Sequence, residues 1–143
     1  MAKIEKSLVI DAPVERVFDF MANPENLPEI WPSLQEVRNI QPLPNGGYAY
    51  DWSYKMGGIR FDGRAEWIEF VKNQRIVYKN TSSIPSMFVW TYQPEAGGAR
   101  VSVDVDYTVP NAILGKLAAP VLHKINEHEA ETVLANLKAR MEG

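Results

Sequence analysis

The chain has 143 residues, a formal net charge of −3 at pH 7 and no cysteine. This length fits a single domain spanning residues 1–143. The lack of cysteine excludes thiol catalysis, cysteine zinc sites and disulfides, and it fits a reducing compartment. The N-terminal residues lack the long apolar stretch of a signal peptide, so we expect a cytoplasmic protein. No stretch is strongly basic, and none is apolar for long enough to span a membrane, so we expect neither a nucleic-acid partner nor an integral membrane segment.

The first 32 residues predict a strand followed by two short helices. Apolar residues alternate with polar ones along residues 4–10, as in a strand with one buried face, except that Lys6 falls on the apolar side. Asp11 or Ala12 is then expected to cap the first helix. The second helix is expected to end at Trp31-Pro32, because the residue before a proline disfavours helical geometry.

The clearest strand signal lies between Tyr48 and Met56, where aromatic residues and methionine alternate strictly with small or polar ones. Such alternation places one face of a strand in the core and the other in water. Gly57-Gly58 predicts a tight hairpin, and residues 59–67 return with the same alternation. After Trp67 the phase shifts by one residue, which indicates a β-bulge or the end of the strand.

Three further strands are predicted at residues 75–80, 87–93 and 100–109, with a hairpin loop at residues 94–98. Strands joined by such short loops must be antiparallel neighbours, because a parallel return needs a long crossover. The final helix is expected to start near residue 110 and to reach about Met141, with an interruption between Gly115 and Pro120.

These elements predict an α+β fold in which a curved antiparallel sheet of about seven strands wraps around a long C-terminal helix. The sheet has one apolar face that must be covered, and the C-terminal helix is the only predicted element long enough to cover it. Short connections throughout the sheet support this arrangement, because they leave no room for crossover helices. The sequence carries no signal for the oligomeric state.

Aromatic side chains concentrate on the predicted inner face of the sheet. All six tyrosines fall there, and a buried phenol hydroxyl without a partner costs about 1–3 kcal/mol. The pattern therefore favours an interior that contains a ligand, water or polar groups of the covering helix. The alternative is that aromatic residues simply fill a wide gap between sheet and helix. The other inward aromatic residues are Trp52, Phe61, Trp67, Phe88 and Trp90.

The C-terminal helix carries two polar residues within its apolar stripe. At about 100° per residue, Asn126 and Glu129 lie on the side that also bears Leu122. Buried polar groups need partners, which a ligand or the tyrosines would supply, unless this stretch lies at the sheet edge and reaches water. The predicted ligand-binding residues are Tyr50, Trp52, Tyr54, Phe61, Trp67, Trp90, Tyr107, Leu122, Asn126 and Glu129.

Several kinds of catalytic and cofactor site have no signature in the chain. His123 and His128 are the only histidines, and five residues apart they point about 140° away from each other, so they cannot share a metal as an i, i+4 pair does. A single helix histidine is usually a surface residue, and we expect neither one to be catalytic. Phosphate loops, dinucleotide fingerprints and nucleophile elbows are missing. We therefore expect no metal and no cofactor, and the catalytic residues of any reaction stay unassigned.

Two segments of the chain carry a family resemblance. Residues 12–20 (APVERVFDF), followed by residues 23–28 (NPENLP) and Trp31-Pro32, resemble the opening of START-like helix-grip proteins, the SRPBCC superfamily. Residues 134–142 (LANLKARME) are similar to the closing helix of its polyketide cyclase/dehydrase-like branch. The resemblance extends over the whole chain and implies a helix-grip fold with a deep cavity between sheet and helix.

The same resemblance implies a range of functions. Family members bind lipids, sterols, quinones or plant hormones, cyclise polyketides, or regulate partner proteins. No catalytic residue carries over to this chain, and its two histidines do not supply the His/carboxylate iron site of the Rieske oxygenase branch.

Three functional hypotheses follow. The first is binding or transport of a hydrophobic small molecule such as a lipid, polyketide or quinone, with Ile113, Leu114 and Leu117 forming a mobile mouth. The second is a cyclase/aromatase-type or hydrolase-type enzyme that uses tyrosine and Glu129 as acid and base. The third is an interaction module without a ligand, in which a partner docks on the outer face of the sheet or at the helix ends.

Overall fold

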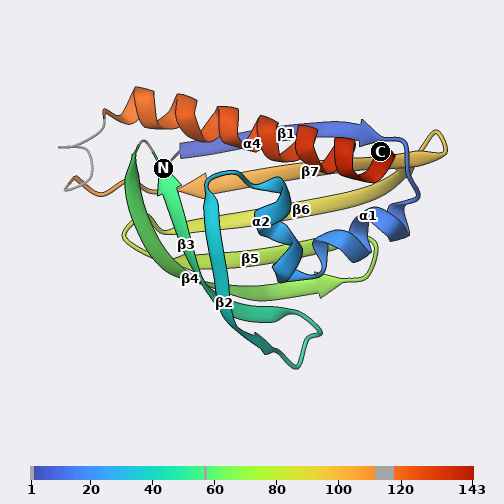
Figure 1. The fold of residues 1–143 in the computed structure, drawn as a ribbon, viewed down its shortest axis with the longest axis horizontal. Coiled ribbons are helices and arrows are strands. Elements are labelled where there is room, and N and C mark those ends of the chain that lie inside the picture. Colours follow the sequence, from blue (N-terminus) through green and yellow to red (C-terminus); the bar gives the residue numbers. More distant parts are fainter. Residues whose placement is uncertain (1, 57, 112–117) are drawn as a thin grey trace.

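The computed structural model describes residues 2–56, 58–111 and 118–143. Within this part of the chain, seven strands form one antiparallel sheet, and the predicted α+β class is confirmed (Figure 1). The strands are β1 (Ala2–Ile10), β2 (Leu34–Pro42), β3 (Tyr48–Met56), β4 (Ile59–Val71), β5 (Arg75–Thr81), β6 (Ser86–Glu95) and β7 (Gly98–Tyr107). The helices are α1 (Val14–Met21), a 3-10 turn (Pro24–Asn26), α2 (Leu27–Ile30) and α4 (Ala119–Glu142).

The strand order is β1-β7-β6-β5-β4-β3-β2. Every pair that follows in sequence from β2 to β7 is joined as an antiparallel neighbour, as the short connections predict. The remaining pair, β1 with β7, joins the first strand of the chain to the last, with Ile4 opposite Val105 and Ile10 opposite Ala99. The predicted bulge after Trp67 is present as a register shift between Trp67 and Glu69.

Helix α1 begins later than expected. Its N-cap is Pro13, which is extended and makes no side-chain cap hydrogen bond, so neither Asp11 nor Ala12 caps the helix. The Pro13 carbonyl instead accepts hydrogen bonds from the N–H groups of Arg16 and Val17, at 3.0 and 3.2 Å. The Asp11 N–H is directed to the other end of the chain, where it donates to the Glu142 carboxylate at 2.8 Å.

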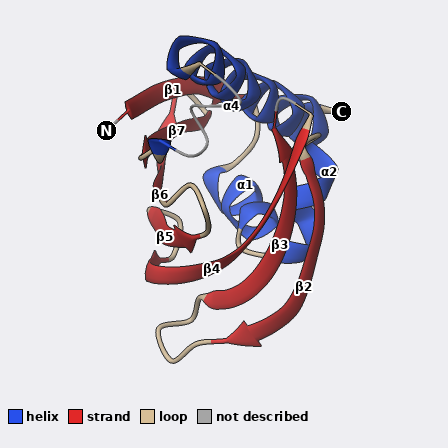
Figure 2. Ribbon diagram, turned by 90° about the vertical axis from the view of Figure 1, so that its left-hand side faces the viewer, coloured by secondary structure: helices blue, strands red, loops and turns tan. Residues whose placement is uncertain are grey.

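Helix α4 lies along β1 and covers the open side of the curved sheet, as Figure 2 shows. Its C-terminal half is tied down by the Asn136 amide, which donates to the Ile30 carbonyl at 3.0 Å. The middle of α4 explains why a lysine, Lys6, falls on the apolar side of β1. The ammonium of this inward lysine reaches the carboxylates of Glu131 at 2.9 Å and Glu127 at 3.5 Å, so the residue joins β1 to the helix.

The interior between α1 and the sheet is filled by aromatic rings. Phe18 of α1 packs edge-on against Tyr92, with 5.2 Å between the ring centroids. Trp67 is stacked against Phe70 and Tyr78, at 6.0 and 6.1 Å. Other rings thus enclose Trp67, which is 1% exposed, so the interior around it is a solid core.

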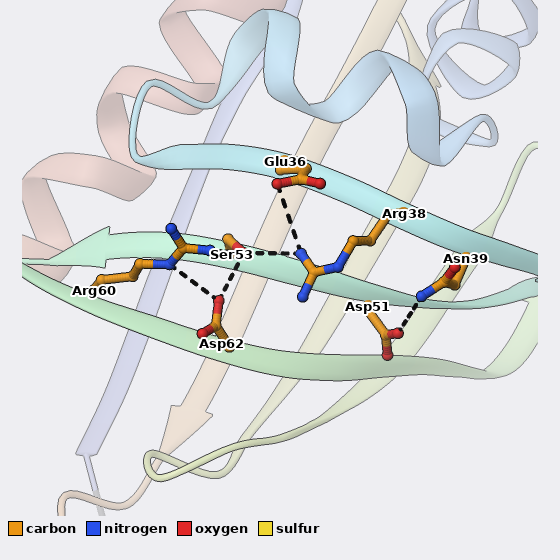
Figure 3. A network of polar contacts seen from close by, with 7 residues as sticks. All are labelled: Glu36, Arg38, Asn39, Asp51, Ser53, Arg60 and Asp62. Carbon is orange, nitrogen blue, oxygen red and sulfur yellow. Dashed lines mark hydrogen bonds and ion pairs between the residues drawn. The ribbon is translucent and has the colours of Figure 1, made fainter.

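The outer face of β2, β3 and β4 carries a network of charged side chains (Figure 3). Its centre is Ser53, which the alternation assigns to the wet face but which is only 1% exposed. The Ser53 hydroxyl accepts from Arg38 at 2.9 Å and Arg60 at 3.1 Å, and donates to Asp62 at 2.7 Å. The hydrogen bond from Ser53, and then the one from Arg60, lower the pKa of Asp62. Side chains lying over Ser53 therefore bury it on the outer face.

Candidate functional site

A cavity of about 120 Å³ lies between the inner face of the sheet and α4. Its wall is mainly aromatic and aliphatic. Most of the lining side chains belong to β3 to β7 and α4, and further ones come from β1, α2, the start of β2 and the connections that follow α2 and β5. The helix contributes Asn126, Glu129, Ala130 and Val133, whose spacing places them on one face of α4. The cavity occupies the part of the interior that the aromatic core leaves open.

Most of the predicted ligand-binding residues reach this wall. Trp67 and Leu122 are the exceptions, because neither side chain lines the cavity. Both point inward as expected, but neighbouring side chains cover Trp67 and Leu122 completely. Contact of the others with a ligand stays a prediction. Those that line the cavity are Tyr50, Trp52, Tyr54, Phe61, Trp90, Tyr107, Asn126 and Glu129.

Two of the inward phenol groups find their partners within the sheet. The Trp67 indole N–H donates to the Tyr50 hydroxyl at 3.1 Å, across the β3–β4 pair. The Trp90 N–H donates to the Tyr78 hydroxyl at 3.0 Å, across β5 and β6. The expectation that these hydroxyls need a ligand, water or helix side chain is therefore wrong for Tyr50 and Tyr78. An aromatic pair on adjacent strands supplies the missing hydrogen bond itself.

Burial raises the pKa of Tyr50, Tyr78 and Tyr92 above the ordinary phenol value of 10.0. The raised pKa means that the folded protein holds these protons more tightly than the unfolded chain does. This contribution to stability is fully present below pH 10.0 and is lost as the pH rises above that value, because only the unfolded chain then ionises freely.

We therefore expect a pH titration followed by phenolate absorbance at 295 nm to separate the tyrosines into two groups. Tyr50, Tyr54, Tyr78 and Tyr92 should stay protonated until the protein unfolds at alkaline pH, and then ionise together with the loss of near-ultraviolet circular dichroism. Gradual ionisation of all tyrosines near pH 10, with the dichroism unchanged, would contradict the buried environment.

At the N-terminal end of α4, Tyr107 and His123 form a hydrogen-bonded pair. The Tyr107 hydroxyl lies 2.8 Å from His123 Nδ1, and the two rings are stacked with centroids 6.1 Å apart. His123 is thus half-buried beside a cavity residue rather than a plain surface histidine. Its position in the sequence could have predicted this, because His123 comes three residues before Asn126 and both therefore lie on the same side of the helix.

Other residues of the wall were not among the predicted site residues. Asn80 accepts a hydrogen bond from the Trp52 N–H at 3.2 Å and donates to the Ser86 hydroxyl at 3.0 Å. Trp31 also lines the cavity, although its sequence signal concerned only the end of α2. Its position beside Phe88, with ring centroids 5.5 Å apart, depends on how the chain folds back over the sheet.

A polar group of four residues lies near the start of β2, and three of its members, Trp31, Tyr54 and Glu129, line the cavity. One oxygen of the Glu129 carboxylate accepts the Ser33 backbone N–H at 3.1 Å. Tyr54 lies beside them. Burial, and to a smaller extent the negative charge of Glu129, raise the pKa of the Tyr54 phenol. Hydrogen bonds from Trp31 and Ser33 partly offset this rise, because they lower the same pKa. We call Trp31, Ser33, Tyr54 and Glu129 the polar corner.

A comparison with models of known protein families identifies the family of this chain. The model described as "Polyketide cyclase / dehydrase and lipid transport" matches residues 1–142. The chain belongs to this family. A comparison with curated proteins found no match.

Solved structures agree with this polyketide cyclase/dehydrase and lipid transport family at the level of the fold. TTHA0849 from Thermus thermophilus is similar with a TM-score of 0.86 and 19% identity, over 99% of this chain and 97% of that one. A START superfamily protein from Mycobacterium smegmatis gives 0.80 and 14%, over 98% and 97%. The di-domain ARO/CYC StfQ from the steffimycin biosynthetic pathway gives 0.80 and 17%, over 98% of this chain and 50% of its own.

Three further predictions for this family member concern a mouth of the cavity, a metal site and membrane-spanning segments. The proposed mouth at Ile113, Leu114 and Leu117 lies outside the described residues. In the described part of the chain, no cluster of three or more histidine, aspartate or glutamate side chains could hold a metal ion. None of the described helices is both long and apolar enough to cross a membrane.

Proposed function

We propose that the protein binds a hydrophobic small molecule in the cavity between the sheet and α4. The observation that carries this proposal is the composition of the wall, which combines many aromatic and aliphatic side chains with a few polar groups. Ligand pockets typically have this composition, because apolar contacts supply affinity while a few polar groups orient the ligand. Membership in a family described by lipid transport and polyketide chemistry supports the same proposal.

The size of the cavity narrows the proposal to small ligands. Its volume is about 120 Å³, whereas drug-sized ligands occupy pockets of about 300–1,000 Å³. An apolar cavity of about 150 Å³ holds one benzene-sized ring. A substituted single ring is therefore the best match to the cavity in this conformation, and a lipid, a tailed quinone or a full polyketide would require it to enlarge.

Filling the cavity tests the proposal. Ala130 lines the wall, so Ala130→Leu places three more carbon atoms in the cavity and should weaken binding of ethylbenzene and 4-ethylphenol by about tenfold or more, a change of about 1.4 kcal/mol. Titrations followed by NMR chemical shifts would measure both affinities, and native mass spectrometry of the purified protein would detect any ligand already bound.

The matched control is Ala135→Leu, which makes the same substitution at an exposed position of the same helix. It should leave both affinities unchanged. Equal binding by the wild-type protein and Ala130→Leu, with both folded, would place the bound probe elsewhere and reject the cavity as the binding site.

A second candidate function is acid–base catalysis on the bound molecule, and the Tyr107–His123 pair favours it. Tyr107 lines the cavity, and its hydroxyl is 2.8 Å from an imidazole nitrogen of His123. Such a pair can pass a proton between a ligand oxygen and solvent, with the phenol at the ligand and the imidazole behind it. Incubation of an identified ligand in D₂O, followed by mass analysis, separates this candidate from simple binding, because catalysis of enolisation adds deuterium to the ligand's carbon atoms faster than in the same solution without protein.

A further inference from the structure

The indole ring of Trp52 lies over a glycine on the inner face of β4. Trp52 is opposite Gly63 in the β3–β4 pair, and a Cβ added at Gly63 would come within 2.7 Å of the indole Cη2 and still closer to Cζ2. The ring therefore occupies the space that a side chain on β4 would fill. It cannot come closer to β4, so any displacement moves the ring away from the sheet and into the space between the sheet and α4, where the cavity lies.

The nitrogen edge of the same ring is held by Asn80 of β5. The Trp52 Nε1–H donates to Asn80 Oδ1 at 3.2 Å, and the Asn80 amide nitrogen donates to the Ser86 hydroxyl at 3.0 Å. Because Ser86 accepts from the nitrogen, the oxygen of the amide faces the indole, which can only donate. Two hydrogen bonds thus connect β3 to β5 and β6, and all three residues line the cavity.

Other contacts of the Trp52 ring are fewer than those of the core tryptophans. Trp52 is half-buried, whereas Trp67 and Trp90 are each 1% exposed. Among the described residues, its aromatic neighbour is Tyr54, which is placed edge-on with 6.3 Å between the ring centroids. Asn80 is the acceptor that the structure gives to the Trp52 N–H. The position of the ring therefore depends on this hydrogen bond as well as on packing.

The residue type at position 80 is better explained by this contact than by the strand. Asparagine is disfavoured in strands, and its amide needs partners when it is buried. Asn80 is 7% exposed. A β-branched apolar residue would suit the strand and fill the same part of the wall, but it would leave the Trp52 N–H without its acceptor.

We propose that Asn80 is a positioning residue that sets the size of the ligand the cavity accepts, and that it acts through Trp52. With the hydrogen bond in place, the ring stays against Gly63 and the cavity keeps its width in front of β4. Without it, the ring adopts rotamers that enter the cavity, because an N–H with no acceptor no longer favours the observed one. This inference rests on the proposed function, because it concerns binding in the same cavity.

The test compares a smaller and a larger apolar probe, benzene and ethylbenzene, by NMR titration. The quantity measured is the ratio of the dissociation constants, Kd of ethylbenzene over Kd of benzene. Asn80→Leu should raise this ratio by about fivefold, while the Kd of benzene changes less than about twofold, because the smaller probe needs less of the space. Asn80→Thr, whose hydroxyl is one bond too short to replace the amide oxygen, is a second variant with the same expectation.

Two comparisons show whether the effect passes through Trp52. Lys79→Leu makes the same kind of change at an exposed neighbouring position of β5 and should leave both dissociation constants unchanged. Trp52→Phe removes the N–H, so that adding Asn80→Leu to it should change the ratio less than about twofold. An equal rise of the ratio in both backgrounds, or no rise in either, would overturn the inference.

A second measurement needs no ligand. In the wild-type protein a nuclear Overhauser effect should connect Trp52 Hζ2 with the Gly63 Hα protons. Asn80→Leu should lose it, while the cross-strand effects between β3 and β4 remain. If this contact persists at full intensity in the folded variant, packing alone places the ring and the inference is wrong. If neither probe binds to the wild-type protein, the proposed function fails and the inference fails with it; if both bind with a ratio that Asn80→Leu does not change, only the inference fails.

Discussion

Replacement of Trp67 by alanine is expected to lower the free energy of unfolding by about 4 kcal/mol. Trp67 is 1% exposed and stacks against Phe70 and Tyr78. Its removal leaves a cavity that the two strands of the β4–β5 pair cannot close without losing their register. It also takes away the N–H that satisfies the buried Tyr50 hydroxyl at 3.1 Å. Denaturant unfolding followed by circular dichroism measures the loss.

The control is the next residue of the same strand. Ile68 points to the outer face and is 48% exposed, so Ile68→Ala should change stability by no more than about 0.5 kcal/mol. Trp67→Phe should fall between the two, because it keeps a stacked ring but removes the donor. A loss below about 1 kcal/mol for Trp67→Ala would mean that this side chain lines an open pocket, as its alternation alone suggests, and is not part of the solid core.

Gly63→Ala is expected to cost about 2–3 kcal/mol and to deform the cavity wall. An added Cβ would come within 2.4 Å of Trp52 Cζ2 and 2.8 Å of the Thr81 carbonyl oxygen. The indole of Trp52 therefore covers the glycine opposite it in the β3–β4 pair. Because Trp52 lines the cavity, the displaced ring should also weaken binding of ethylbenzene by several-fold.

A double-mutant cycle separates the clash from general strain in the strand. Trp52→Leu removes the ring that the new methyl group meets, so Trp52→Leu/Gly63→Ala should be more stable than the sum of the single effects by about 1 kcal/mol. Gly97→Ala is the comparison for backbone strain alone, since it has a φ of +84° and nothing within 4 Å. A loss for Gly63→Ala no larger than that for Gly97→Ala would argue against the close approach.

Local alternation was a reliable guide to which face of each strand is inside. Tyr50, Phe61, Trp67 and Trp90 are all buried as predicted, and the phase shift after Trp67 coincides with a register shift in the β4–β5 pair. Ser53 departs from this pattern, because arginine side chains from neighbouring strands cover it on the outer face. Period-two alternation reports direction only, and long charged side chains can bury a small residue on the wet side.

The candidate site was predictable in its composition but not in its arrangement. An inward aromatic residue can line the cavity, as Trp90 does. It can instead be enclosed in the core by rings of other strands, as Trp67 is by Tyr48 of β3 and Tyr78 of β5. Sequence spacing carries no measure of that space. Trp31 and His123 were missed for a related reason, because their partners lie on elements far away in the chain.

By itself, the sequence determined the α+β class, the C-terminal helix as the cover of the sheet, the antiparallel pairing of consecutive strands and the inward face of the strands that show a clear alternation. These properties depend on residue periodicity and on short connections, which act between neighbours in the chain. Tertiary structure alone decided the pairing of β1 with β7, the extent of the cavity and the meeting of Trp31, Tyr54 and Glu129. Those properties require distant segments to close on one another, and the closure depends on packing over the whole sheet rather than on local pattern.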